Sequence, residues 1–264
     1  MSYNYKKAFS NPSMLFNFIK YRFYTIFSDL NPTTVTYNQA KLFFDIREEN
    51  NELVSSIKPI IKNSKVIFDI GANAGYFSKE IFEAGFSGRV ILFEPIPNLM
   101  SIAVKTLSSF INEKIFINGA LGEETGEIEM FLPNDSNLGW ITAVGKKTQN
   151  QKSIKANVFD TSYFVNLFEP DFIKIDVEGY EVFVLRPFVK MITNDYNPIF
   201  LVELGWGVSN PNWNEFIKVV NSFYLKGYKF YYAKNPNKEI VFQQLENLSS
   251  TMDVIIKPSE KSLK

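Results

Sequence analysis

Residues 66–78 of the chain read VIFDIGANAGYFS, and this stretch decides the fold. Val66–Ile70 is an apolar run with the length of a buried strand, and the residues from Tyr76 onward favour a helix. Gly71 and Gly75 lie between the two, where they allow a tight turn and a close backbone approach by a ligand. The stretch is therefore predicted to be a strand, a glycine turn and a helix, which is a repeating unit of α/β folds.

The alternation of strands and helices continues along the chain and predicts a doubly wound, mostly parallel sheet with helices on both faces. The predicted strands are 66–70, 89–93, 115–118, 126–132, 154–159, 172–177, 199–204, 228–233 and 252–256. The predicted helices are 39–61, 76–84, 97–110, 180–192 and 213–225, with a short helix after the cap Asp160-Thr161. A ligand of such a sheet binds beyond the carboxyl ends of the strands, so residues that follow strands are the candidates.

The first sixty residues lie outside this alternation. We predict an N-terminal helical extension over residues 1–62, the α/β domain over 63–257 and a tail over 258–264. Residues 14–27, MLFNFIKYRFYTIF, are aromatic nearly all round. Two interpretations stay open, and we favour the first: a helix packed on the domain or on a second copy, or an interfacial helix in weak contact with a membrane surface.

Composition excludes several kinds of chemistry. The chain has no Cys and no His, which excludes disulfides, thiolate zinc sites and Cys nucleophiles, so any general base must be Asp, Glu, Lys or Tyr. Basic and acidic residues number 28 each, without the basic surplus typical of nucleic-acid binding, and we expect no nucleic-acid partner. The start lacks a signal-peptide pattern and no apolar run is long enough to span a membrane, so the expected location is cytoplasmic.

The ends of the first three predicted strands favour a nucleoside ligand. Asp69 lies at the end of the first strand, where its carboxylate can accept from loop amides or from a ligand ammonium. Glu94 ends the second strand, where a carboxylate can accept both hydroxyls of a ribose. The third strand ends in Asn118-Gly119-Ala120, small residues that suit an adenine ring. An ordinary turn or a helix cap would explain each feature alone, but their combination favours binding.

Charge gathers in the run KIDVEGYE at residues 174–181. On a strand, Lys174, Asp176 and Glu178 project from one face. Three charges on a buried strand are costly unless they pair, bind a ligand or lie at its open end. Glu181 follows in the first turn of the next helix. A structural salt-bridge cluster is the alternative, but the position at the predicted ligand edge favours a functional role.

Together these motifs resemble the FkbM family of methyltransferases. The resemblance covers residues 66–204 and is carried by DIGANAGYFS at 69–78, FEP at 93–95, NGALG at 118–122 and KIDVEGYE at 174–181. It implies a class I methyltransferase fold of Rossmann-like type, S-adenosylmethionine as methyl donor, and a hydroxyl acceptor, often on a sugar or a natural product. It also implies that Gly71, Asn73 and Gly75 surround the methionine part of the cofactor, with Glu94 at the ribose and Ala120 at the adenine.

The resemblance further implies that Asp176 and Glu178 lie near the transferred methyl group. An alcohol is a poor nucleophile until it loses its proton, so we predict that one of these carboxylates is the general base, with Lys174 or Glu181 tuning it. Glu203, at the end of the strand 199–204, is a second-rank candidate. A divalent ion held by these carboxylates could instead lower the pKa of the acceptor, and the sequence leaves this metal open.

The predicted activity is therefore O-methylation of a hydroxyl on a sugar, a glycan or its precursor. Two alternatives remain: a non-sugar small-molecule hydroxyl as acceptor, and a non-catalytic nucleotide-binding scaffold. A nicotinamide oxidoreductase is disfavoured, because it would be expected to carry the G-x-G-x-x-G fingerprint, which the glycine turn lacks. Trp140, Trp206 and Trp213 could stack on a sugar ring, with core or lid packing as an equally good interpretation. The oligomeric state is not predicted.

Overall fold

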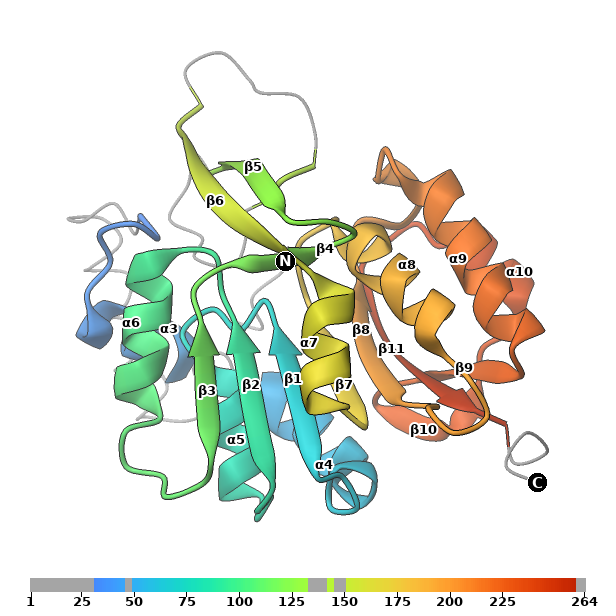
Figure 1. The fold of residues 1–264 in the computed structure, drawn as a ribbon, viewed down its shortest axis with the longest axis horizontal. Helices are drawn as coiled ribbons and strands as arrows, with labels where there is room; N and C mark the ends of the chain where they lie inside the picture. The colour runs from blue at the N-terminus through green and yellow to red at the C-terminus, as the bar shows by residue number, and fades with distance from the viewer. Residues whose placement is uncertain (1–30, 46–48, 133–141, 145–150, 260–264) are drawn as a thin grey trace, which may run out of the picture.

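A central eight-stranded sheet organises the protein (Figure 1). The computed structural model describes residues 31–45, 49–132, 142–144 and 151–259. From edge to edge the strands are β10 (Asn235–Glu239), β9 (Tyr228–Tyr232), β11 (Met252–Pro258), β8 (Ile199–Leu204), β7 (Phe172–Ile175), β1 (Val66–Ile70), β2 (Arg89–Phe93) and β3 (Lys114–Ile117). Strands β8, β7, β1, β2 and β3 are parallel, whereas β11 runs antiparallel to both of its neighbours. The mostly parallel α/β sheet predicted from the sequence is confirmed.

Helices cover both faces of this sheet, because successive side chains of each strand point to opposite faces. Ile67 packs in one buried cluster with α4 (Glu49–Ile61), α5 (Tyr76–Glu83) and α6 (Pro97–Thr106). The next residue, Phe68, packs in a second cluster on the other face. The helices of that face are α7 (Thr161–Phe168), α8 (Glu181–Met191), α9 (Trp213–Leu225) and α10 (Phe242–Glu246). Two apolar layers therefore enclose the sheet.

A small second sheet stands over the carboxyl ends of the parallel strands (Figure 1). Its strands are β4 (Ala120–Gly122), β6 (Ser153–Asp160) and β5 (Gly126–Phe131), in that spatial order. Met130 and Ala156 on its inner side pack in a third cluster with α3 (Tyr37–Asp45) and the start of α6. This inserted sheet covers the edge of the central sheet at which a doubly wound fold binds its ligand.

Several elements differ from the sequence-based expectation. The helix expected over 39–61 is two helices, α3 and α4, and residues 46–48 between them lie outside the described residues. The short elements β4, β10 and α10 were not expected from the pattern, and β7 ends two residues earlier than predicted. Residues 14–27 and Trp140 also lie outside the described residues, and the three-segment division of the chain stays a prediction. No helix among the described residues combines the length and apolar character needed to cross a membrane.

Candidate active site

A cavity of about 230 Å³ lies at the carboxyl ends of the parallel strands. Strand ends and the turns after them supply most of the polar residues in its wall. The inserted sheet and the helices α3 and α4 add apolar residues. The cavity wall includes Gly71, Asn73, Glu94, Ala120, Ile128, Met130, Ala143, Lys174, Asp176, Glu178, Glu203, Lys234 and Asp253. Seven of the ten site residues predicted as catalytic or cofactor-binding therefore line one cavity.

The turn after β1 needs glycine at its first position. Gly71 has φ +75°, and a Cβ there would lie 1.8 Å from the carbonyl oxygen of Asp176. The turn is tied to β2, because the amide of Gly71 donates to the carbonyl of Phe93 at 3.0 Å. Gly75 has φ +79° but does not line the cavity; a Cβ there would lie 3.1 Å from the Cβ of Ala103 on α6. Gly71 thus shapes the cavity, whereas Gly75 lets α5 approach α6.

Glu94 is a buried carboxylate at the edge of the cavity, with 5% of its surface exposed. Its Oε2 accepts from the amide of Asn73 at 2.9 Å, and its Oε1 accepts from the amide of Ile96 at 2.8 Å. Each oxygen keeps a second lone pair for a ligand hydroxyl. Burial raises the pKa of Glu94 to about 7. Ala120 lies in the same cavity wall and adds an apolar surface beside this acid.

Lys174 ties the glycine turn to the carboxylates of the cavity. Its Nζ donates to the carbonyl of Gly71 at 2.9 Å and lies 3.3 Å from Asp176 Oδ2 and 3.5 Å from Asp69 Oδ1. Burial opposes the charge on Lys174, but Asp176 and Asp69 outweigh it, so its pKa is raised. Asp69 is fully buried, accepts from the hydroxyl of Ser78 at 2.6 Å and does not line the cavity. Asp69 therefore contacts the site through Lys174.

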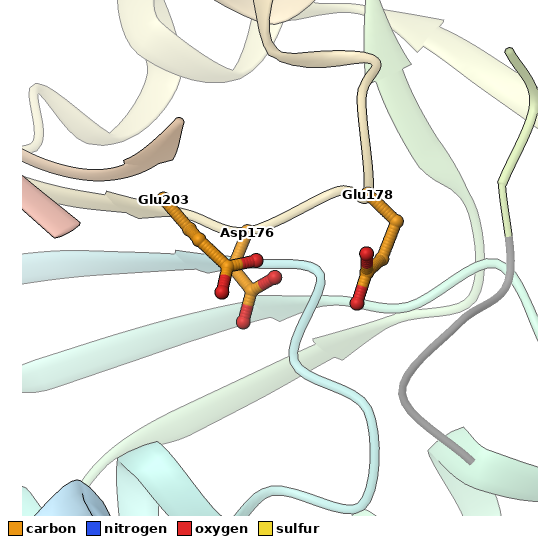
Figure 2. A group of neighbouring side chains, drawn as sticks. All are labelled: Asp176, Glu178 and Glu203. Atoms are coloured by element: carbon orange, nitrogen blue, oxygen red, sulfur yellow. The ribbon is translucent and has the colours of Figure 1, made fainter. Parts of the chain in front are cut away.

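Three carboxylates that line the cavity lie close together, as Figure 2 shows. Asp176, Glu178 and Glu203 each place an oxygen within 4.8 Å of the others. The charge of Asp176, followed by burial, raises the pKa of Glu203 far above its ordinary value. Asp253 pairs in register with Glu203 on the antiparallel strand β11 and lines the same cavity. Oxygen donors of this kind are the ligands of hard divalent cations, so the site can hold either a retained proton or a metal.

The backbone brings Glu178 to this cluster by a turn and not by strand pleating. The strand ends at Ile175, so the predicted alternation of three charges on one strand face stops there. Glu178 has φ +50° and Gly179 has φ +98°, and this reversal directs the chain into α8. Glu181 lies beneath the turn, with 3% exposed surface, and its Oε1 accepts from the amide of Gly179 at 2.9 Å. Burial raises the pKa of Glu181 to about 7, and Glu181 does not line the cavity.

Two of the three tryptophans considered for sugar stacking lie among the described residues, and neither lines the cavity. Trp213 is buried, stacks on Phe216 and donates from Nε1 to the carbonyl of Glu246 at 3.2 Å, which confirms the packing interpretation for this residue. Trp206 packs against Gly179, where an added Cβ would lie 3.2 Å from its ring. Lys234 and Asp253 are cavity residues that sequence reasoning missed, because they follow no predicted motif.

The strand order, the glycine turn after β1 and the acid after β2 define a class I S-adenosylmethionine-dependent methyltransferase. More particularly, the chain belongs to the FkbM family: the methyltransferase FkbM domain matches residues 69–230, more than half of its length. S-adenosylmethionine is therefore its methyl donor. No curated protein matches the chain significantly.

Solved structures with a similar arrangement include three methyltransferases. An O-methyltransferase from Bacillus cereus, in complex with SAH, is 12% identical, with 93% of this chain and 90% of that chain covered and a TM-score of 0.43. A TehB-like SAM-dependent methyltransferase from Corynebacterium glutamicum is 12% identical, with 84% and 97% covered and a TM-score of 0.44. A precorrin-6y C5,15-methyltransferase from Geobacter metallireducens is 11% identical, with 79% and 86% covered and a TM-score of 0.43. Similarity at this level carries no information about the acceptor.

Proposed function

We propose that the protein is an O-methyltransferase that acts on a hydroxyl of a sugar, a glycan or its precursor. The observation that carries the proposal is one cavity lined by Glu94, the glycine turn and the carboxylates of Asp176, Glu178 and Glu203. S-adenosylmethionine supplies an electrophilic methyl group when it is bound. The residues of the chain then need only to orient both reactants and accept one proton.

The chemistry of the cavity wall fits this cofactor. Glu94 has free lone pairs for the two ribose hydroxyls, and Ala120 offers an apolar surface for adenine. Gly71 and Asn73 lie in the turn that would surround the methionine part. Gly75 and Asp69, which were also predicted to bind the cofactor, lie outside the cavity wall. In the proposal these two shape the site indirectly, through α5 and Lys174.

The proton of the acceptor hydroxyl passes to Asp176 or Glu178 in this proposal. Lys174 holds Asp176 beside the glycine turn, so the carboxylate stays close to the cofactor. Glu203 keeps a proton next to Asp176, because two close carboxylates do not both ionise readily. In a second mechanism Asp176, Glu178 and Glu203 would hold a divalent ion, which would lower the pKa of the acceptor hydroxyl. Glu181 tunes the site only through the turn that it supports.

The acceptor side of the cavity favours a small polyhydroxylated molecule. Lys234 and Asp253 offer charged hydrogen-bonding groups, and Ile128 and Met130 of the inserted sheet offer an apolar wall. The balanced net charge supports a small-molecule or glycan acceptor over a nucleic acid. A non-sugar hydroxyl would use the same groups, so it is the second candidate. The proposal keeps the cytoplasmic location expected from the sequence.

Single replacements of Asp176 by Asn and Glu178 by Gln test the base mechanism. The readouts are S-adenosylhomocysteine formation with a panel of nucleotide sugars and glycans, and calorimetric titration with S-adenosylmethionine. We expect kcat to fall roughly 10²- to 10⁴-fold in at least one variant while the cofactor Kd stays unchanged. Glu127→Gln, which alters an exposed acid on the inserted sheet, is the matched control. Near-normal turnover in both variants would refute the role of these carboxylates.

Chelation distinguishes the general-base mechanism from the metal mechanism. Dialysis against EDTA leaves turnover unchanged if a carboxylate alone accepts the proton. A loss that Mg²⁺ or Mn²⁺ restores favours the metal mechanism. Cofactor binding without turnover on the whole panel would favour the non-catalytic scaffold.

A further inference from the structure

Thr142 connects the inserted sheet to the turn that carries Glu178. Its hydroxyl donates to the backbone carbonyl of Glu178 at 2.6 Å, and its side chain is half-buried. We infer that Thr142 is a positioning residue, which holds Glu178 in the cavity and so couples the inserted sheet to methyl transfer. The inference rests on the proposed function of Glu178 as base or metal ligand.

The turn at Glu178 needs such support. Glu178 has φ +50°, a backbone conformation that is uncommon for a residue with a Cβ, and it costs free energy unless the surroundings hold it. The following residue, Gly179, is held on both sides: its amide donates to Glu181 Oε1 at 2.9 Å, and its carbonyl accepts from Asn210 Nδ2 at 3.0 Å. These two contacts come from buried residues below the cavity. The contact from Thr142 holds the carbonyl of Glu178 itself, from the side of the inserted sheet.

Thr142 forms an antiparallel bridge to Phe131 at the end of β5, so a shift of the inserted sheet can change its position. Its carbonyl accepts from the amide of Phe131 at 2.7 Å, and its amide donates to the carbonyl of Phe131 at 3.3 Å. Its Oγ1 accepts from the amide of Val144 at 2.9 Å. The other acceptor near the hydroxyl, the carbonyl of Val144, is 3.3 Å away, so the Glu178 carbonyl is the better partner.

The same segment forms part of the cavity wall. Phe131 is the last residue of β5, whose Ile128 and Met130 line the cavity, and Ala143 lines it next to Thr142. The wall that would contact the acceptor and the turn that carries Glu178 are therefore joined by one hydrogen bond. A displacement of this wall changes the position of Glu178, and an acceptor that seats against the wall stabilises the productive position.

Thr142→Val removes the hydroxyl at nearly constant shape, and Thr142→Ser restores it. Amide hydrogen exchange of the peptide 176–181 needs no acceptor. We expect exchange about fivefold faster in Thr142→Val, the factor that one net hydrogen bond sets, and unchanged exchange in Thr142→Ser. The control is Thr161→Val, which loses an equivalent bond to the carbonyl of Gly122 at 2.8 Å. This control should leave exchange of the peptide unchanged.

Kinetics complete the test. We expect kcat to fall roughly 5- to 30-fold in Thr142→Val with the S-adenosylmethionine Kd unchanged, and to recover in Thr142→Ser. In a Glu178→Gln background, Thr142→Val should lower kcat no further, because the two residues act as one unit. Should Thr142→Val not fold, Thr142→Ala serves for the same comparisons.

The outcomes separate the two proposals. If Thr142→Val is fully active while Glu178→Gln is impaired, the inference about Thr142 is overturned and the proposed function stands. The same holds if amide exchange of the peptide 176–181 in Thr142→Val is as slow as in the wild type. Full activity of Glu178→Gln overturns the proposed role of Glu178 and the inference with it. Equal losses of kcat for Thr142→Val in both backgrounds also overturn the inference, because Thr142 would then act independently of Glu178.

Discussion

Replacing Lys174 by methionine should destabilise the protein by about 3–5 kcal/mol, because it leaves a buried carboxylate without its cation. The Lys174 side chain is 10% exposed and the Asp69 side chain is 0% exposed. At 3.5 Å the two charges attract by about 5 kcal/mol if the effective dielectric constant is about 20. Among the residues that the structure describes, Asp69 Oδ1 has no hydrogen-bond partner, and the hydroxyl of Ser78 would remain to stabilise the charge.

Urea unfolding at pH 7, followed by circular dichroism, measures this loss of free energy. Lys155→Met is the matched control, because its ion pair with Glu127 has side chains 76% and 62% exposed and contributes less than about 1 kcal/mol. The double variant Asp69→Asn with Lys174→Met removes both charges. It should recover more than half of the stability lost in Lys174→Met.

A loss for Lys174→Met as small as that of the control would refute the reasoning, since Asp69 would then need no counterion. An undiminished loss in the double variant would assign the cost elsewhere. Lys174 also lies 3.3 Å from Asp176 Oδ2 and donates to the carbonyl of Gly71, which holds the glycine turn.

Three further predictions concern the glycine turn, the buried acid and a helix cap. Burial raises the pKa of Glu94 to about 7, and its charged form accepts ribose hydroxyls better. Affinity for S-adenosylmethionine should therefore rise up to about tenfold from pH 6 to pH 8. Calorimetry of Glu94→Gln should show weaker binding without this rise. A wild-type pH profile in the variant would contradict the role of Glu94 at the ribose. Gly71→Ala should abolish cofactor binding, because its Cβ would lie 1.8 Å from the carbonyl oxygen of Asp176. Gly85→Ala should cost only about 1 kcal/mol in thermal unfolding, because an added Cβ there meets no atom of the described part of the chain within 4 Å. Equal behaviour of the two alanine variants would argue against the role of this turn. Asp160 caps α7 through an amide of its first turn, so Asp160→Ala should lose about 1 kcal/mol in urea unfolding, and an unchanged midpoint would show that the cap adds nothing.

Most of the sheet could be predicted from the sequence, because its signals are local. Apolar runs locate β1, β2 and β8 to the residue, and the glycines after β1 indicate a backbone that turns with positive φ. The carboxyl ends of parallel strands meet at one edge, so Glu94 and Asp176 could be placed in one site although 82 residues separate them (176 minus 94). The strand pattern missed β10 and α10, whose short polar sequences lack a clear period.

The directions of the side chains at the site could not be predicted from the sequence. Asp69, Gly75 and Glu181 belong to motifs that also supply cavity residues, yet packing turns them toward α5, α6 and the turn below the cavity. Glu178 reaches the cavity because its backbone adopts positive φ, which breaks the strand alternation on which the prediction relied. Thr142 is bridged to the end of β5 and bonds to the carbonyl of Glu178, and nothing in its neighbouring sequence indicates this contact.

Local patterns in the sequence therefore predicted most of the strands and helices, the glycine turn and the acids at the strand ends, since each depends on a short run of residues. Tertiary structure decided which of the predicted acids line the cavity and which are buried beneath it. Contacts such as Lys174 with Asp69, Glu203 with Asp253 and Thr142 with Glu178 join segments distant in the chain. Their geometry is set by the packing of whole elements, which local periodicity does not encode.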